Sequence, residues 1–200
     1  MKPIIVTTEP ELNTELCKFI PLLTSSATNS LGTLVGLAVK PAYKSKVPVL
    51  ALCSSSHIVI IQLSQFESIP VSLYNFLALS DVTFVGVAIK DSVAKLNRDY
   101  DLECKTAVEI GDLVSFTFQK PYLRDCGLVS LSHEVFQSEY SIGLSAITGS
   151  WDATSLNDEQ IKQVAASAYV SYEIGNRLLG RSAVITETVE EQVEEQGNEY

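Results

Sequence analysis

The chain of 200 residues lacks the features that mark several large classes of protein. No apolar run approaches the ~20 residues that a helix needs to cross a bilayer, so no association with a membrane is predicted. The N-terminal segment MKPIIVTTEPELNTEL carries acids where a secretory signal would be apolar, and we therefore expect an intracellular protein, in the cytoplasm or the nucleus. The four cysteines form no CxxC pair, which favours reduced thiols over a zinc site; they are Cys17, Cys53, Cys104 and Cys126.

Sequence motifs for phosphate binding are also absent. The chain contains neither a P-loop nor a GxGxxG turn, so no backbone cradle for a nucleotide is indicated. Its two histidines, His57 and His133, have no partner at the spacing of metal ligands, and surface positions are expected for both. A group of three lysines, Lys40, Lys44 and Lys46, is typical of a solvated loop, with a phosphate contact as the alternative.

Basic residues are missing from the last part of the chain, beyond Arg181. Six glutamates follow that position, so the terminal segment supplies −6 of the total net charge of −10. A protein that binds nucleic acid through bulk charge needs a basic footprint, which this balance does not supply. We expect residues 182–200 to be an acidic, disordered tail, and residues 1–181 to form one domain.

Apolar runs and turn residues predict an alternation of strands and helices along the domain. Strands are expected at 2–7, 31–40, 47–53, 57–63, 82–89 and 106–110, with the third and fourth joined as a hairpin. Helices are expected at 8–23, 71–79 and 91–100, in two or three pieces of 111–137, and at 157–180. This order is typical of an α/β protein with a mixed sheet and helices on both faces.

Two of the expected helices begin at residues that suit a helix cap. Asp91 or Ser92 is predicted to cap the helix that follows the strand at 82–89. Asn157 is predicted to cap the last helix, where Gln160 three residues later completes a capping box. Gly180 is expected to end that helix.

The centre of the sheet is predicted to be the run LGTLVGLAVK, from Leu31 to Lys40. It is apolar nearly throughout and rich in β-branched residues, as buried strands are. Side chains alternate along a strand, so Ala38 and Lys40 are expected to point to the same face.

Four segments together resemble the DEDD-type 3′–5′ exonucleases of the RNase H-like superfamily, including plant Werner-syndrome-exonuclease-like proteins. They are VGLAVKP with the following VLALCSSSHIVIIQL, then VSLYNFLALSDVTFVGVAIKDSVAKLNRDYDL, then GLVSLSHEVF, and finally WDATSLNDEQIKQVAASAYVSYEIGNRLLG. They occur in the family's order and cover most of residues 31–180. The resemblance implies an RNase H-like (DnaQ-like exonuclease) fold, with a mixed five-stranded sheet flanked by helices.

In that family the central strand ends in Asp-x-Glu, the turn after a later strand adds an Asp, and the last helix adds Tyr-x-x-x-Asp. The four carboxylates hold two Mg²⁺ or Mn²⁺ ions, which activate water and bind the scissile phosphate, while the tyrosine positions the water. In this chain each of these positions holds another residue: Ala38, Lys40, Ser92, Gln163 and Ser167. The resemblance therefore implies vestigial positions and no bound metal cofactor.

One acid, Asp91, lies next to the third carboxylate position and is the fallback candidate for a metal ligand, although a helix cap is the favoured interpretation. We expect a catalytically inactive 3′–5′ exonuclease homologue that acts as a binding or assembly subunit, in a homo- or hetero-oligomer with a related exonuclease. One alternative is an active exonuclease on single-stranded nucleic acid with displaced ligands such as Asp91 and Asp152. The other is a non-cleaving binder of single-stranded 3′ ends, in which Lys40 contacts the phosphate.

Overall fold

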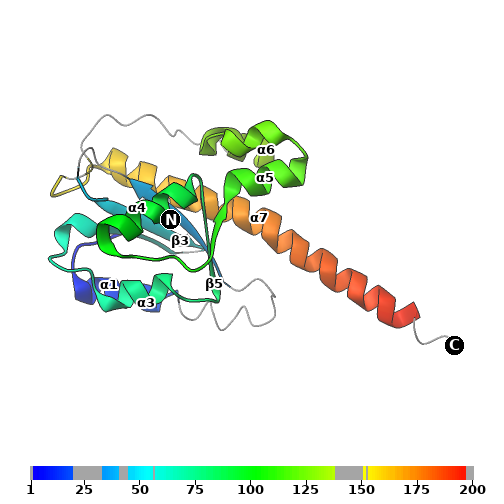
Figure 1. Cartoon of the computed structure of the whole chain (residues 1–200), viewed down its shortest axis with the longest axis horizontal. Helices are drawn as coiled ribbons and strands as arrows, with labels where there is room; N and C mark the ends of the chain where they lie inside the picture. Colours follow the sequence, from blue (N-terminus) through cyan, green and yellow to red (C-terminus); the bar gives the residue numbers. More distant parts are fainter. Residues whose placement is uncertain are drawn as a thin grey trace.

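The computed structural model describes residues 2–19, 33–40, 45–55, 57–137, 151 and 153–196, with side chains as far as residue 179. A mixed sheet crosses the middle of the molecule, and helices cover both of its faces (Figure 1). This is the α/β architecture that the sequence predicts. Within the described part of the chain, no helix has both the length and the apolar character that crossing a membrane requires.

The sheet has six strands in the order β1-β4-β3-β2-β5-β6. Their bounds are Ile4–Val6, Thr33–Lys40, Val49–Ser54, His57–Gln62, Val82–Gly86 and Ala107–Glu109 for β1 to β6. The antiparallel run β2-β3-β4 is flanked by parallel pairs, β1 on β4 and β5 and β6 beside β2. The expected number of five strands is corrected to six, because β1 extends the sheet along β4.

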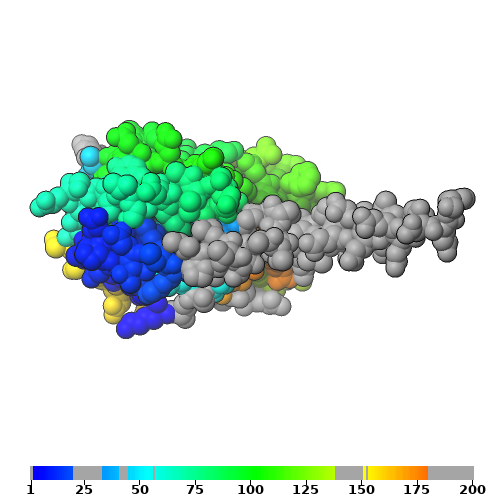
Figure 2. Space-filling view, turned by 90° about the horizontal axis from the view of Figure 1, so that it is seen from below, coloured from blue at the N-terminus to red at the C-terminus, as the bar shows by residue number. Residues whose placement is uncertain are grey.

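One face of the sheet is covered by α1 (Glu9–Cys17), α3 (Val71–Leu77) and α4 (Ile89–Tyr100), with the short 3₁₀ helix η2 (Leu63–Gln65) at its edge. α1 and α3 lie side by side on the surface of this layer, in dark blue and blue-green (Figure 2). Fully buried aromatic and aliphatic side chains fill the space beneath them, among them Phe19, Phe84, Leu50 and Ile61.

The other face is covered by α5 (Ile110–Phe118), η3 (Pro121–Asp125), α6 (Leu128–Phe136) and α7 (Asp158–Gln196). α7 runs along β2 and β3 at very close range. A Cβ atom at Gly36 of β2 would collide with the backbone oxygen of Ala168 and would lie 2.8 Å from the backbone nitrogen of Tyr172. A glycine is therefore required where the central strand meets this helix.

The ends of several elements differ from the expected ones. α1 ends at Cys17, and residues 18 and 19 form a turn, so the expectation that the helix continues through these two residues is wrong. The expected end at residue 23 lies outside the described residues. β5 ends at Gly86 instead of residue 89. Ile89, expected in the strand, is the first residue of α4, because Ala88 takes a left-handed conformation (φ 50°) that turns the chain.

The start of α7 agrees with the sequence, and its end does not. Asn157 and Gln160 form the expected capping box: Gln160 N donates to Asn157 Oδ1 at 2.9 Å, and Asn157 N donates to Gln160 Oε1 at 3.0 Å. The helix continues beyond Gly180 to Gln196, so the expected end at Gly180 is wrong. One glycine inside a helix costs only about 1 kcal/mol relative to alanine, and no further glycine or proline occurs before Gly197.

The backbone of residues 182–196 is therefore helical where a disordered tail was expected. In Figure 1 this part of α7 projects away from the sheet. The division of the chain into a domain at 1–181 and a separate acidic tail stays a prediction.

Candidate functional site

The end of the central strand and the middle of α7 face one another. Ala38 packs into the core between β2, β3 and α7, whereas Val39 packs into the core on the opposite face. This alternation places Lys40 on the α7 side, as the strand pattern predicts. β2 and α7 thus bring together four of the five positions that the resemblance predicts to be vestigial, from two segments far apart in the sequence.

The ammonium of Lys40 meets the hydroxyl of Ser167. Lys40 Nζ lies 3.5 Å from Ser167 Oγ, at the outer limit of a hydrogen bond. Ser167 donates its own hydrogen to the backbone oxygen of Gln163, one helical turn earlier, at 2.8 Å. Its lone pairs are therefore the part that faces the ammonium. The ring of Trp151 also lies beside this ammonium, with its centroid 5.5 Å from Lys40 Nζ.

Lys40 is a half-buried cation, and the contacts around it stabilise its charge only weakly. Burial lowers the pKa of its ammonium below the usual range, because the charged form loses water. Among the described residues, no carboxylate forms an ion pair with it. A hydroxyl at 3.5 Å and the face of an indole are the partners that the structure gives it.

Ser92, the remaining position that the resemblance predicts to be vestigial, lies on α4 and not on β2 or α7. It lies half-buried in the first turn of α4, where its backbone nitrogen donates to Ala88 O at 3.0 Å. The buried residues of α4, Ile89 and Leu96, pack on the face of the sheet opposite to α7. The described contacts join Lys40 to Ser167, and they do not join Ser92 to either residue.

Asp91 does not cap α4. It is exposed in the first turn, while Ala88 occupies the cap position. The backbone nitrogens of Ala88 and Ile89 each donate to a different oxygen of Glu109 at 2.9 Å. Glu109 ends β6, the strand next to β5, so the cap comes from a residue 20 positions further along the chain. The other fallback ligand, Asp152, lies outside the described residues.

The donor set at the β2–α7 contact does not fit a pair of magnesium ions. Mg²⁺ needs several oxygen ligands and carboxylates to balance its charge. The residues in place offer a methyl group at Ala38, an ammonium at Lys40, an amide at Gln163 and a hydroxyl at Ser167. No cluster of three or more histidines, cysteines or acids suited to a metal occurs in the part of the chain that the structure describes.

Sequence reasoning missed two residues of this region. Trp151 is the only tryptophan in the chain, and it begins the last of the four segments that resemble the exonuclease family. This position could have identified it as a candidate site residue. The role of Glu109 had no local signal, because the cap and its helix are joined only by the pairing of β5 with β6.

Two curated plant proteins are similar in sequence, and no protein-family model matches the chain. The chain is 29% identical over 106 residues to the Arabidopsis thaliana protein RISC-interacting clearing 3′–5′ exoribonuclease 1, covering 53% of this chain and 52% of that protein. It is 24% identical over 174 residues to an A. thaliana 3′–5′ exonuclease, covering 84% of this chain and 60% of that protein. The chain thus spans little more than half the length of each.

Solved structures of the EXD2 exonuclease domain share the fold. The form soaked in Mn and dGMP has a TM-score of 0.50 and 23% identity, over 90% of this chain and 89% of that chain. The form soaked in Mn has a TM-score of 0.50 and 24% identity, over 90% of both. The expected RNase H-like fold is confirmed by this likeness.

Proposed function

Since the chain is a 3′–5′ exonuclease-like domain with the RNase H-like fold, we propose that it does not cleave nucleic acid and acts by binding. The observation that carries this proposal is the position of Lys40. Its ammonium lies 3.5 Å from Ser167 Oγ, between the strand and the helix that supply carboxylates in the exonucleases. Two like unit charges about 4 Å apart repel by about 4 kcal/mol at an effective dielectric of 20. A cation entering this site meets that repulsion and finds no carboxylate at the vestigial positions.

The binding role that fits best is that of a subunit in an assembly. We propose a homo-oligomer, or a hetero-oligomer with an active relative that supplies the catalytic carboxylates. One relative is named as a RISC-interacting exoribonuclease, and an enzyme of that kind is the partner class that we propose. The framework of sheet and α7 would then serve assembly, without metal chemistry of its own.

A nuclease assay tests the loss of catalysis. Purified protein is incubated with 3′-labelled single-stranded DNA and RNA in Mg²⁺ and Mn²⁺, and Mn²⁺ binding is followed by calorimetry. We expect neither shortening nor a two-ion isotherm. Metal-dependent trimming that persists through re-purification and disappears in Asp91→Ala would overturn the proposal in favour of displaced ligands.

A restored variant shows whether the framework is intact. It combines Ala38→Asp, Lys40→Glu, Ser92→Asp, Gln163→Tyr and Ser167→Asp. If β2 and α7 keep the family's separation, this variant binds Mn²⁺ where the unmodified chain does not. The smaller variant Lys40→Glu with Ser167→Asp is the control for folding, because it adds only two of the four acids.

Light scattering tests the assembly. We expect a mass above that of the monomer at tens of micromolar, or a mixed complex once an active relative is added. A monomer in both experiments contradicts the assembly role.

A second candidate function rests on the charge of Lys40, which forms no ion pair with a carboxylate in the part of the chain that the structure describes. A half-buried cation of this kind can serve as counter-charge to a phosphate, and the Trp151 ring beside it can stack on a base. The protein would then hold single-stranded 3′ ends without cutting them. Anisotropy with labelled oligonucleotides tests this: metal-independent binding should weaken with salt and with Lys40→Met. Binding that Lys40→Met leaves unchanged excludes this site.

A further inference from the structure

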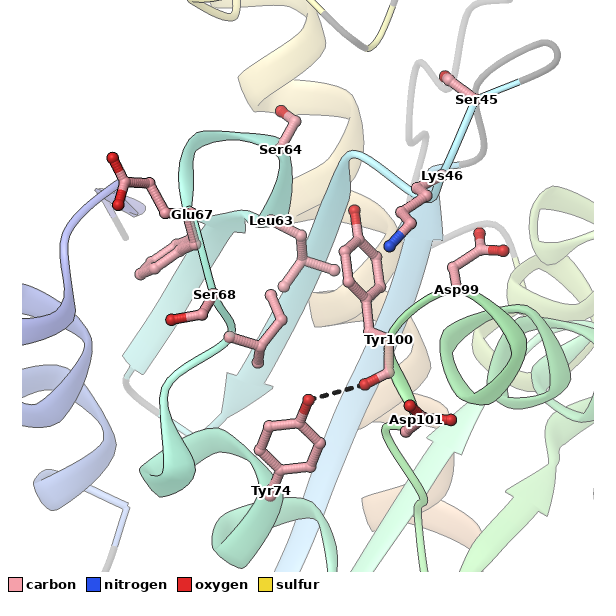
Figure 3. Close-up of a pocket in the computed structure, with 12 residues that line it drawn as sticks. Ser45, Lys46, Leu63, Ser64, Glu67, Ser68, Tyr74, Asp99, Tyr100 and Asp101 are labelled. Carbon is pink, nitrogen blue, oxygen red and sulfur yellow. Dashed lines mark hydrogen bonds between the residues drawn. The ribbon is translucent and has the colours of Figure 1, made fainter.

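A cavity of about 480 Å³ lies on the face of the sheet opposite to Lys40. It opens between the loop that follows β4, the end of α4 and the segment before β3 (Figure 3). Leu63, which is fully buried, and Ile69 give it an apolar wall, and Tyr74 and Tyr100 give it an aromatic one. Its volume falls within the range of ordinary small-molecule sites.

The aromatic wall is held in place by hydrogen bonds. Tyr74 donates its hydroxyl to the backbone oxygen of Tyr100 at 2.8 Å, the dashed line in Figure 3. The hydroxyl of Tyr100 donates to the backbone oxygen of Val47 at 2.6 Å. The backbone nitrogen of Val47 donates to Asp99 Oδ2 at 2.9 Å. Tyr100 is thus fixed at both its hydroxyl and its carbonyl, so the wall exists before any ligand arrives.

The ring of Tyr100 already accepts a cation. Lys46 Nζ lies 5.1 Å from the ring centroid, within the range of a cation–π contact, and Figure 3 shows its amine directed at the ring. The side chain of Lys46 is exposed, so it can leave the ring without uncovering a buried group. The contact with Lys46 therefore indicates that the face of the Tyr100 ring is accessible to an ammonium group.

The charges around the cavity favour further cations. Among the residues that the structure describes, one base, Lys46, and three acids, Glu67, Asp99 and Asp101, line it. Asp99 is paired with Arg98 at 2.7 Å, which leaves Glu67 and Asp101 as exposed acids on opposite sides of Leu63 (Figure 3). Asp101 also sits at the C-terminal end of α4, where the helix dipole adds negative potential.

We propose that this cavity binds a linear aliphatic polycation. The methylene chain lies along Leu63 and Ile69, and ammonium groups reach Glu67 at one side and Asp101 at the other. An ammonium takes the place of Lys46 on the Tyr100 ring. Such a ligand has two sources, a free polyamine or the lysine side chains of a basic peptide. The site is separate from the β2–α7 contact and independent of the proposed function.

Calorimetry with spermidine tests the free form. We expect saturable binding with a Kd of about 1 mM or tighter, weakened about fivefold by Asp101→Asn and by Glu67→Gln. Asparagine tolerates the left-handed conformation of Asp101 (φ 57°), so this variant keeps the fold. The matched control is Asp125→Asn, which removes one exposed acid outside the cavity and should leave the Kd unchanged.

A peptide distinguishes the two sources. A short unstructured peptide with three lysines is titrated under the same conditions, and 1,6-hexanediol serves as an uncharged chain. Tighter binding of spermidine indicates a free polyamine, and tighter binding of the peptide indicates a basic segment of a partner. The proposal is overturned if neither cation binds saturably, if Asp125→Asn weakens binding as much as Asp101→Asn, or if hexanediol competes.

Discussion

Lys40 Nζ and Ser167 Oγ lie 3.5 Å apart, although 127 positions separate the two residues in the chain. The contact exists because the end of β2 and the middle of α7 keep a fixed relation across the core. The resemblance to 3′–5′ exonucleases implies that the same two elements carry the metal ligands in that family. A cation and a hydroxyl meet at this contact, and the proposal that the chain does not cleave nucleic acid depends on these two groups standing in the place of such ligands.

Replacing Lys40 with methionine should stabilise the protein. The change removes a half-buried charge that has no carboxylate partner in the described structure and keeps the apolar stem. We expect the free energy of unfolding to rise by about 1 kcal/mol at pH 7, measured by urea denaturation. The exposed Lys105→Met is the control and should have little effect. A loss of stability in Lys40→Met contradicts this account of the site.

The gain in stability from Lys40→Met should depend on pH. Burial lowers the pKa of Lys40 in the folded state below its usual value of 10.5. Between the folded and unfolded pKa values, the unfolded chain binds more protons, so the stability of the unmodified protein rises with pH in that window. The advantage of Lys40→Met should therefore shrink as the pH approaches 10.5. An advantage that stays constant across this range rules out desolvation of Lys40 as its cause.

Glu109 should matter more than Asp91 for the start of α4. Glu109→Gln leaves one oxygen for the two backbone nitrogens of Ala88 and Ile89 and should cost about 1–2 kcal/mol. Asp91→Asn removes only a favourable charge near the helix N-terminus, worth about 0.5 kcal/mol. Urea denaturation of both variants decides the order. The reverse ranking would restore Asp91 as the cap.

Gly36→Ala should be strongly destabilising. The added methyl group meets the backbone of α7 at Ala168 and Tyr172, and backbone atoms cannot rotate away as a side chain can. We expect a loss of about 2–3 kcal/mol, or failure to fold. Gly127→Ala is the matched control, because a Cβ there has no neighbour within 4 Å, and it should cost less than about 1 kcal/mol. Equal losses would show that α7 yields to the new group.

Removing residues 182–200 should leave the melting temperature within about 2 °C of that of the whole chain. The projecting part of α7 carries five glutamates and lies away from the sheet, so the core keeps its contacts when it is removed. The control is truncation after Val170, which removes the buried Tyr172 and Ile174 and should prevent folding. A drop of several degrees in the shorter truncation would show that the end of α7 packs on the domain.

The elements that sequence reasoning predicted well are those whose evidence is local. Alternation along β2 placed Ala38 and Lys40 on the same face of the sheet, and the pair of Asn157 and Gln160 marked the start of α7. The frame of the site could be predicted because the periodicity of one strand and one helix determines which side chains face each other.

The errors occur where the deciding contact is distant in sequence. Asp91 has the right residue type for a cap, but Glu109 reaches the same backbone nitrogens from the neighbouring strand. Gly180 has the right type for a helix end, but a single glycine costs too little to stop the helix, and no proline or second glycine follows it before Gly197. The contact between Lys40 and Trp151 depends on how the chain returns to the sheet before α7, which no local pattern encodes.

α7 continues as one unbroken helix from its buried part into its projecting part. The buried part is locked to β2 by the close approach at Gly36, and the same helix continues about 24 Å beyond Gly180. The outer end of the helix is thereby connected to the central strand through one continuous backbone. Anything that binds the outer end is therefore joined, without an intervening loop, to the strand that carries Lys40.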